Sequence, residues 1–114
     1  MDVLREILLP TTREDAWEAL TEPDRLEEWF ATEVELDLRE GGAAVFRWGD
    51  GDSRHAEVVV VEDEERLVLR FEDDGVVDLR LADAEEGTRV LVRESSPQWG
   101  AALELSALAS WALA

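Results

Sequence analysis

Apolar and polar residues alternate in short runs through the middle of the chain. Val34, Leu36 and Leu38 alternate with charged residues, which is typical of a strand with one buried and one wet face. The apolar positions of the runs that follow are Ala44, Phe46 and Trp48; Ala56 to Val61; Leu67, Leu69 and Phe71; Val77, Leu79 and Leu81; and Val90 and Val92. Turn residues separate these runs at intervals of about eight to twelve residues, so the pattern predicts six strands in a meandering antiparallel sheet.

The start of the chain predicts one further strand, from Val3 to Leu9, which ends at Pro10. Two orientations of this strand are open. If the odd-numbered positions face the core, Arg5 is drawn inward, and if the even-numbered positions do so, Glu6 is. One ionisable side chain is therefore expected to be half-buried, as a structural group that reaches water or as a polar anchor for a ligand.

Two short helices are predicted after the first strand. Thr11 and Glu14 have the spacing of a capping box, and Trp17 and Leu20 then share one helical face. Pro23 suits the first turn of a second helix because its missing N–H is not needed there. The apolar face of this second helix consists of Leu26, Trp29 and Phe30.

A long helix is predicted over Pro97–Ala114, a stretch whose only charged residue is Glu104. Ser95 and Ser96 precede it as candidate capping residues. Its apolar residues occupy more than one side at three- and four-residue steps: Trp99, Leu103, Leu105, Ala107, Leu108, Trp111 and Ala112. Such a helix needs broad cover, from the sheet of its own chain or from the sheet and a second subunit together.

One strand, two short helices, six strands and a long helix together predict a single domain over residues 1–114. A twisted antiparallel sheet of seven strands can curl around one long helix and bury its concave face against it. The expected fold class is therefore α+β, with a helix-grip arrangement of the curved sheet around the C-terminal helix.

Charge and composition narrow the choice of partners. The formal net charge is −18, from 29 acidic against 11 basic residues, and such a surface repels phosphate backbones and anionic lipids. We therefore expect no nucleic-acid binding and no membrane binding. There is no cysteine, no leader-like start and no apolar run of membrane-spanning length, so a cytoplasmic protein is expected.

The chain resembles the START-like superfamily, also called SRPBCC. The residues that carry the resemblance are Arg5 to Ile7, Asp15 to Pro23, Leu26, Trp29, Phe30, Gly41, Gly42, Phe46, Gly87 to Val90, Trp99 and Leu103. Within this superfamily it looks most like the bacterial homologues of the activator of the ninety-kilodalton heat-shock chaperone's ATPase. The resemblance implies a helix-grip fold with a cavity between sheet and helix, which family members use for apolar ligands or for cyclising aromatic polyketides.

The best candidate for a ligand site is a set of large apolar side chains predicted on inner faces. These residues are Trp29, Phe30, Phe46, Trp48, Phe71, Trp99 and Leu103. Indoles combine an apolar body with a hydrogen-bond donor, which suits a pocket. Simple core packing would use the same residues, and only the family resemblance favours the pocket.

No catalytic residue, metal site or cofactor is predicted. His55 is the only histidine, and its position beside Ser53 at the start of a strand favours a surface location. Asp50 and Asp52 flank Gly51 in a hairpin turn that lacks the later ligands of a calcium loop.

Three functions stay open. The first is a module that binds a small apolar or aromatic molecule between the sheet and the C-terminal helix. The second is a polyketide cyclase-like or hydrolase-like enzyme, which would need an acid–base group such as His55 or Arg5 facing the cavity. The third is a protein that interacts with a chaperone or with itself, as a homodimer through Leu105 and Leu108 of the C-terminal helix.

Overall fold

The computed structural model describes residues 3–29, 31–72 and 74–95. The helix predicted over Pro97–Ala114 lies outside the described residues, and so do Ser96, Phe30, Trp99 and Leu103. Within the described part, the chain forms one strand, two helices and six further strands, as the alternation pattern predicts.

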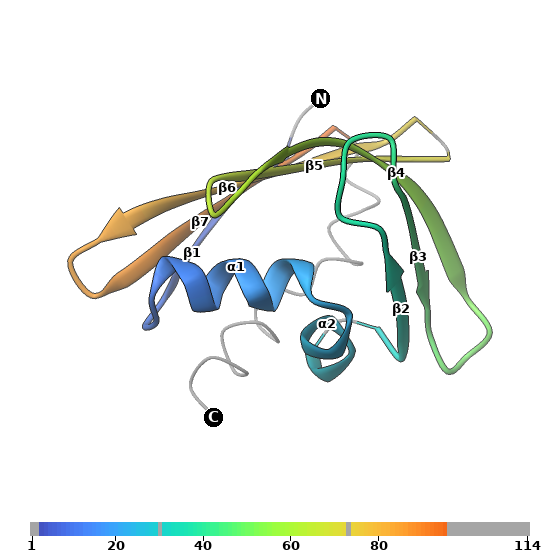
Figure 1. Cartoon of the computed structure of the whole chain (residues 1–114), viewed down its shortest axis with the longest axis horizontal. Helices are drawn as coiled ribbons and strands as arrows, with labels where there is room; N and C mark the ends of the chain where they lie inside the picture. The colour runs from blue at the N-terminus through green and yellow to red at the C-terminus, as the bar shows by residue number, and fades with distance from the viewer. Residues whose placement is uncertain (1–2, 30, 73, 96–114) are drawn as a thin grey trace.

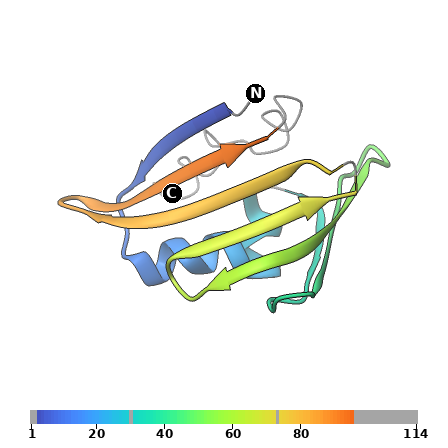
Figure 2. The same cartoon turned by 90° about the horizontal axis from the view of Figure 1, so that it is seen from above.

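The strands of this described part form one antiparallel sheet of seven strands in the order β1-β7-β6-β5-β4-β3-β2. The elements are β1 (Val3–Leu9), α1 (Arg13–Thr21), α2 (Pro23–Trp29), β2 (Glu33–Leu36), β3 (Ala43–Arg47), β4 (Ser53–Glu62), β5 (Arg66–Phe71), β6 (Val76–Ala84) and β7 (Gly87–Glu94). The sheet curves over the two helices, which lie on its concave side (Figure 1). Seen from above, β1 lies beside β7, the last strand in sequence (Figure 2).

The core lies between the concave face and the helices. Helix α1 contacts β6 and β7, and α2 contacts α1 and β2. The buried apolar residues of this core come from both helices, from all seven strands and from the segment between α2 and β2: Leu9, Ala16, Trp17, Ala19, Leu20, Leu26, Ala31, Val34, Ala44, Phe46, Val58, Leu67, Leu69, Phe71, Val77, Leu79, Leu81, Val90 and Val92. Trp17 and Leu20 are both buried, which confirms their predicted common face. No helix in this described part is long and apolar enough to cross a membrane.

The N-cap of α1 is Thr12, not Thr11 as the capping-box spacing predicts. The Thr12 backbone is extended, and its hydroxyl accepts a hydrogen bond from the Asp15 N–H at 3.1 Å. Thr11 is held one residue earlier, because its N–H donates to the Leu9 carbonyl at 2.8 Å. The Thr11 hydroxyl instead donates to the Asp15 carboxylate at 3.1 Å.

Strand β2 is shorter than its apolar alternation predicts, because it ends at Leu36 and leaves Leu38 39% exposed. The chain turns directly after it, where Gly42 N–H donates to the Arg39 carbonyl at 2.8 Å. Gly41 has a φ of +85°, a conformation that favours glycine, and its N–H donates to the Val58 carbonyl of β4. The predicted turn at the glycine pair is therefore confirmed, and it begins before Leu38.

Candidate functional site

Among the described residues, the concave face carries one fully buried carboxyl group, that of Glu94. Strand β7 alternates regularly, so that Thr88, Val90, Val92 and Glu94 are buried while the residues between them are exposed. Glu94 itself is 0% exposed. Sequence reasoning missed this residue, although it stands two positions after Val92 in an alternating strand, which places it on the same face.

The Glu94 carboxyl has no hydrogen-bond partner on either oxygen among the described residues. Its register partners on the neighbouring strands are Val3 of β1 and Val77 of β6, so neither strand offers a polar residue type at this position. Burial raises the pKa of Glu94 above its usual range, and the positive charge of Arg5 offsets only part of this effect. A buried polar group without a partner is rare in folded proteins and calls for an explanation.

Arg5 is a charged residue that faces the same side of the sheet as Glu94. It pairs with Val92, two residues before Glu94 on β7, and its side chain is half-buried on the concave face. Glu6 points the opposite way and forms an ion pair with Arg89, with 3.0 Å between Nε and Oε1. Of the two orientations that the sequence leaves open for β1, the structure therefore has the one that draws Arg5 inward.

Two predicted pocket aromatics lie at the same end of the sheet as Glu94. The rings of Phe46 and Phe71 are buried, with their centroids 6.2 Å apart and their planes tilted by 34°. Glu94 pairs with Val77, which pairs with Leu69, and Phe71 stands two residues beyond Leu69 on β5. Two strand spacings thus separate Phe71 from β7, about 10 Å across the sheet.

The structure describes only part of the other predicted pocket residues. Trp48 is partly buried and packs against the core directly after β3. Trp29 ends α2, and its side chain lies outside the description, as do Phe30, Trp99 and Leu103. The pocket predicted from all seven residues therefore stays a prediction, while Phe46, Phe71 and Trp48 do share the concave side.

His55 does not belong to this site. It is exposed, and its register partner is Val45 on β3, whose even-numbered neighbours Ala44 and Phe46 face the core. His55 and Val45 therefore lie on the convex face, which agrees with the predicted surface position. In the described ranges, no group of three or more histidine, aspartate or glutamate side chains is placed to hold a metal ion.

The convex face holds a second carboxyl of low exposure, that of Asp78, but this one is fully paired. Arg66 donates to both its oxygens at 3.1 and 3.0 Å, and Arg80 donates at 3.5 and 3.4 Å. Burial acts to raise the pKa of Asp78, and these hydrogen bonds outweigh it, so the pKa is lowered. Asp78, Arg66 and Arg80 thus form a structural ion cluster.

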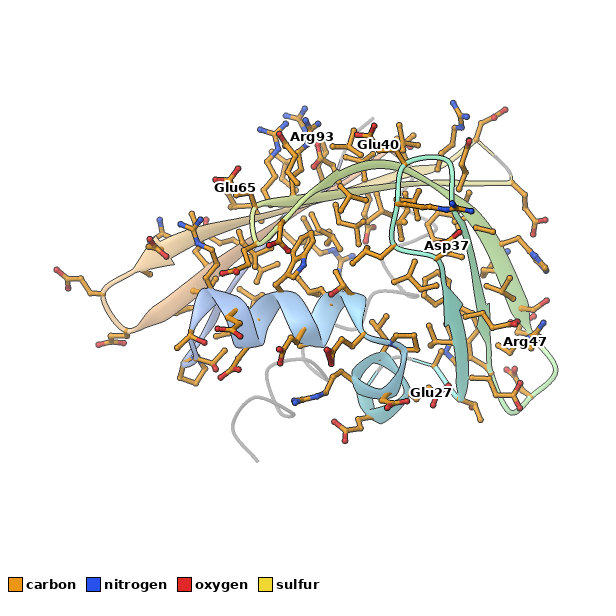
Figure 3. The ribbon with its side chains drawn as sticks, in the orientation of Figure 1. Glu27, Asp37, Glu40, Arg47, Glu65 and Arg93 are labelled. Carbon is orange, nitrogen blue, oxygen red and sulfur yellow. The ribbon has the colours of Figure 1, made fainter. Side chains whose placement is uncertain are left out.

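An open hollow of about 460 Å³ lies beside this cluster, between Leu4, Leu91, Arg80 and Arg93. Arg93 points away from the helices on this outer side (Figure 3). The lining of this hollow mixes exposed leucines with charges of both signs. The hollow lacks a buried, unpartnered group such as the one on the concave face. The concave face around Glu94 is therefore the stronger candidate site.

Comparisons with known proteins agree with this architecture. The model of a family described as "Activator of Hsp90 ATPase homolog 1-like protein" matches residues 10–110. A comparison of the sequence with curated proteins gave no match.

Solved structures of other proteins share the fold. Protein MLL2253 from Mesorhizobium loti superposes with a TM-score of 0.83 at 21% identity, covering 98% of this chain and 93% of that one. The AHSA1-like protein from Aeromonas hydrophila gives a TM-score of 0.78 at 22% identity, covering 99% of this chain and 87% of that one. DynU16, encoded in the dynemicin biosynthetic locus, gives 0.84 at 26% identity over 96% of this chain, which spans 46% of DynU16.

Proposed function

Because this chain belongs to the family of Activator of Hsp90 ATPase homolog 1-like proteins, we propose that it binds a small molecule with an apolar or aromatic body. The molecule would lie against the concave face of the sheet, beside Phe46, Phe71 and Trp48. The observation that carries this proposal is Glu94, a carboxyl group that is fully buried there and has no hydrogen-bond partner among the described residues.

Stability does not account for Glu94. An unsatisfied buried polar group costs about 1–3 kcal/mol, and more if it is charged, whereas a leucine at the same position would contribute by its burial. Its neighbours on the same face, Val92 and Val77, show that the site accepts apolar side chains. A carboxyl with a raised pKa in apolar surroundings is a recognised mark of a binding or catalytic site, where a ligand supplies the missing hydrogen bonds.

The relatives support a small organic ligand. DynU16, at 26% identity, is encoded in the dynemicin biosynthetic locus, and this setting is consistent with a small organic ligand. The likeness to the two proteins at 21% and 22% identity supports the fold only.

Native mass spectrometry of gently purified protein tests the proposal. We expect a bound mass of a few hundred daltons that disappears on denaturation, and tryptophan emission that shifts when the stripped protein is reloaded with the released compound. The proposal would be contradicted if the purified protein holds no ligand and its tryptophan emission does not change when an extract of the cells that produce it is added. The same spectrum reads the subunit count, and a ligand-free dimer would favour self-association instead.

A cyclase-like enzyme is a second candidate, favoured by the placement of Arg5 next to Glu94 on the same face. In such a reaction the Glu94 carboxylate would take a proton from the carbon beside a ketone, and Arg5 would hold the resulting enolate oxygen. Incubation with acetophenone in D₂O tests this chemistry by NMR. Enzymatic exchange of the methyl protons, lost in Glu94→Gln, would favour the enzyme, and absence of exchange would favour a binding module.

A further inference from the structure

We infer that the ligand of the concave face presents a hydrogen-bond donor, a hydroxyl or an amine, to Glu94, and that ligands ending in a carboxylate are rejected. This inference rests on the proposed function and adds the chemistry of the ligand's head group.

Glu94 needs a donor that the described part of the protein does not supply. An ionised carboxyl only accepts hydrogen bonds, through two oxygens, and a protonated one still keeps accepting capacity. Neither oxygen is engaged, and the strand positions on either side are Val3 and Val77. A ligand hydroxyl or ammonium group at this point would satisfy the carboxyl and remove the cost of its burial.

The other carboxyl of low exposure in residues 3–29, 31–72 and 74–95 is paired, which shows that the lack of a partner at Glu94 is specific to this position. Asp78 stands one residue after Val77, on the opposite face of β6, and receives hydrogen bonds from both Arg66 and Arg80. The arginines that bind Asp78 stand on β5 and two residues further along β6. At Glu94 the directly paired positions carry valine, and Arg5, two residues away in register, makes no hydrogen bond with it, which leaves the carboxyl available to a ligand.

The charge of Arg5 does not make the concave face around Glu94 a binding site for anions. Its side chain is only half-buried, so its charge is partly solvated, and it forms no hydrogen bond with Glu94. A ligand carboxylate drawn to Arg5 would come close to the Glu94 carboxyl in apolar surroundings, where two like charges repel strongly. Arg5 is the charged group among the described residues whose field Glu94 feels, and it moderates the raised pKa without cancelling it.

Four naphthalene derivatives with the same ring body test the head group. Naphthalenemethanol and naphthylmethylamine carry a donor, naphthoic acid carries a carboxylate, and methylnaphthalene carries no polar head. We expect the alcohol and the amine to bind about tenfold more tightly than methylnaphthalene, and naphthoic acid to bind most weakly, measured by isothermal titration calorimetry at neutral pH. The carboxyl carbon resonance of Glu94, identified by its loss in Glu94→Gln, should shift with the alcohol and the amine only.

Two variants make the test specific. Glu94→Leu should bring the alcohol and the amine down to the affinity of methylnaphthalene, because the acceptor is gone. Glu6→Leu is the matched control: it stands next to Arg5 in sequence but faces the convex side in an ion pair with Arg89, so it should leave all four affinities unchanged. Circular dichroism confirms that both variants are folded.

The outcomes separate the two proposals. If all four compounds bind equally, if naphthoic acid binds best, or if Glu94→Leu keeps the preference, the inference is wrong while the binding function stands. If none of the four binds and the purified protein retains no small molecule, the proposed function fails and the inference fails with it.

Discussion

Glu94 and Asp78 belong to neighbouring strands and face opposite sides of one sheet, and their surroundings perturb them in opposite directions. Glu94 has no hydrogen-bond donor from the described residues, so burial dominates and raises its pKa. Asp78 is 8% exposed, yet two guanidinium groups donate to it and lower its pKa. The difference arises because Arg66 and Arg80 donate hydrogen bonds to Asp78, whereas Arg5, on the same face as Glu94, donates none to it.

Replacing Glu94 by leucine should stabilise the protein. The raised pKa means that the folded state binds the Glu94 proton more tightly than the unfolded state does, so this group costs stability as the pH rises above its ordinary value of 4.5. We expect Glu94→Leu to add about 1–3 kcal/mol to the free energy of unfolding at neutral pH. Urea denaturation at several pH values should show the gain shrinking towards acid pH, and a gain that does not change with pH would contradict the role of the charge.

The Asp78 cluster should have the reverse dependence on pH. Its lowered pKa means that the ionised carboxyl stabilises the folded state above the ordinary value of 3.8, and that this contribution is lost as the pH falls below it. Asp78→Asn should therefore cost about 1–3 kcal/mol at neutral pH and progressively less in acid. Asp83→Asn is the control, because the ion pair of Asp83 with Arg13 is exposed on the aspartate side and such pairs contribute about 0–1 kcal/mol.

At the scale of elements, the turn between β2 and β3 depends on a buried glycine. A Cβ atom at Gly42 would overlap the Asp37 carbonyl oxygen and stand 2.9 Å from that of Arg39. Both are backbone atoms, so they cannot swing aside as a flexible side chain could. Gly42 also anchors the turn to β4, because its carbonyl accepts the Val58 N–H at 2.8 Å.

Gly42→Ala should therefore destabilise the protein by about 1–3 kcal/mol, the usual cost of overpacking. The matched change is Gly49→Ala, whose new methyl group would meet the Thr32 hydroxyl at an ordinary 3.7 Å and should have little effect. Thermal denaturation followed by circular dichroism measures both. Equal midpoints for the two variants would show that the turn yields more readily than its close contacts indicate.

At the scale of the whole molecule, the net charge of −18 opposes folding through self-repulsion. Many surface arginines are paired with carboxylates, such as Arg47 with Glu35 at 2.8 Å and Arg70 with Glu57 at 2.6 Å. Exposed pairs of this kind contribute little, so the excess of negative charge should dominate the response to salt.

Added sodium chloride should therefore raise the thermal midpoint, because salt screens the repulsion between exposed carboxylates. The measurement is a melting curve between low and molar salt at neutral pH. The rise should flatten once the screening length falls below the spacing of surface charges. A midpoint that falls with salt would instead show that the surface ion pairs outweigh the repulsion.

Local patterns in the sequence were sufficient for the order and type of the elements between Val3 and Glu94. Period-two alternation marked the strands, Pro23 marked the start of α2, and the glycine pair marked a turn, because each depends on a few neighbouring residues. The aromatic residues Phe46 and Phe71 were also expected on the inner side, and both are buried there.

Contacts between distant segments required the folded structure. Alternation alone could not choose between Arg5 and Glu6, because either set of positions on β1 is mostly apolar, and the pairing of β1 with β7 settles the choice. The lack of partners at Glu94 is likewise a property of three aligned strands, since it depends on valine standing at the matching position of both neighbours. The alternation of β7 places Glu94 on the inner face, but its isolation there arises only when residues far apart in the chain are brought into register.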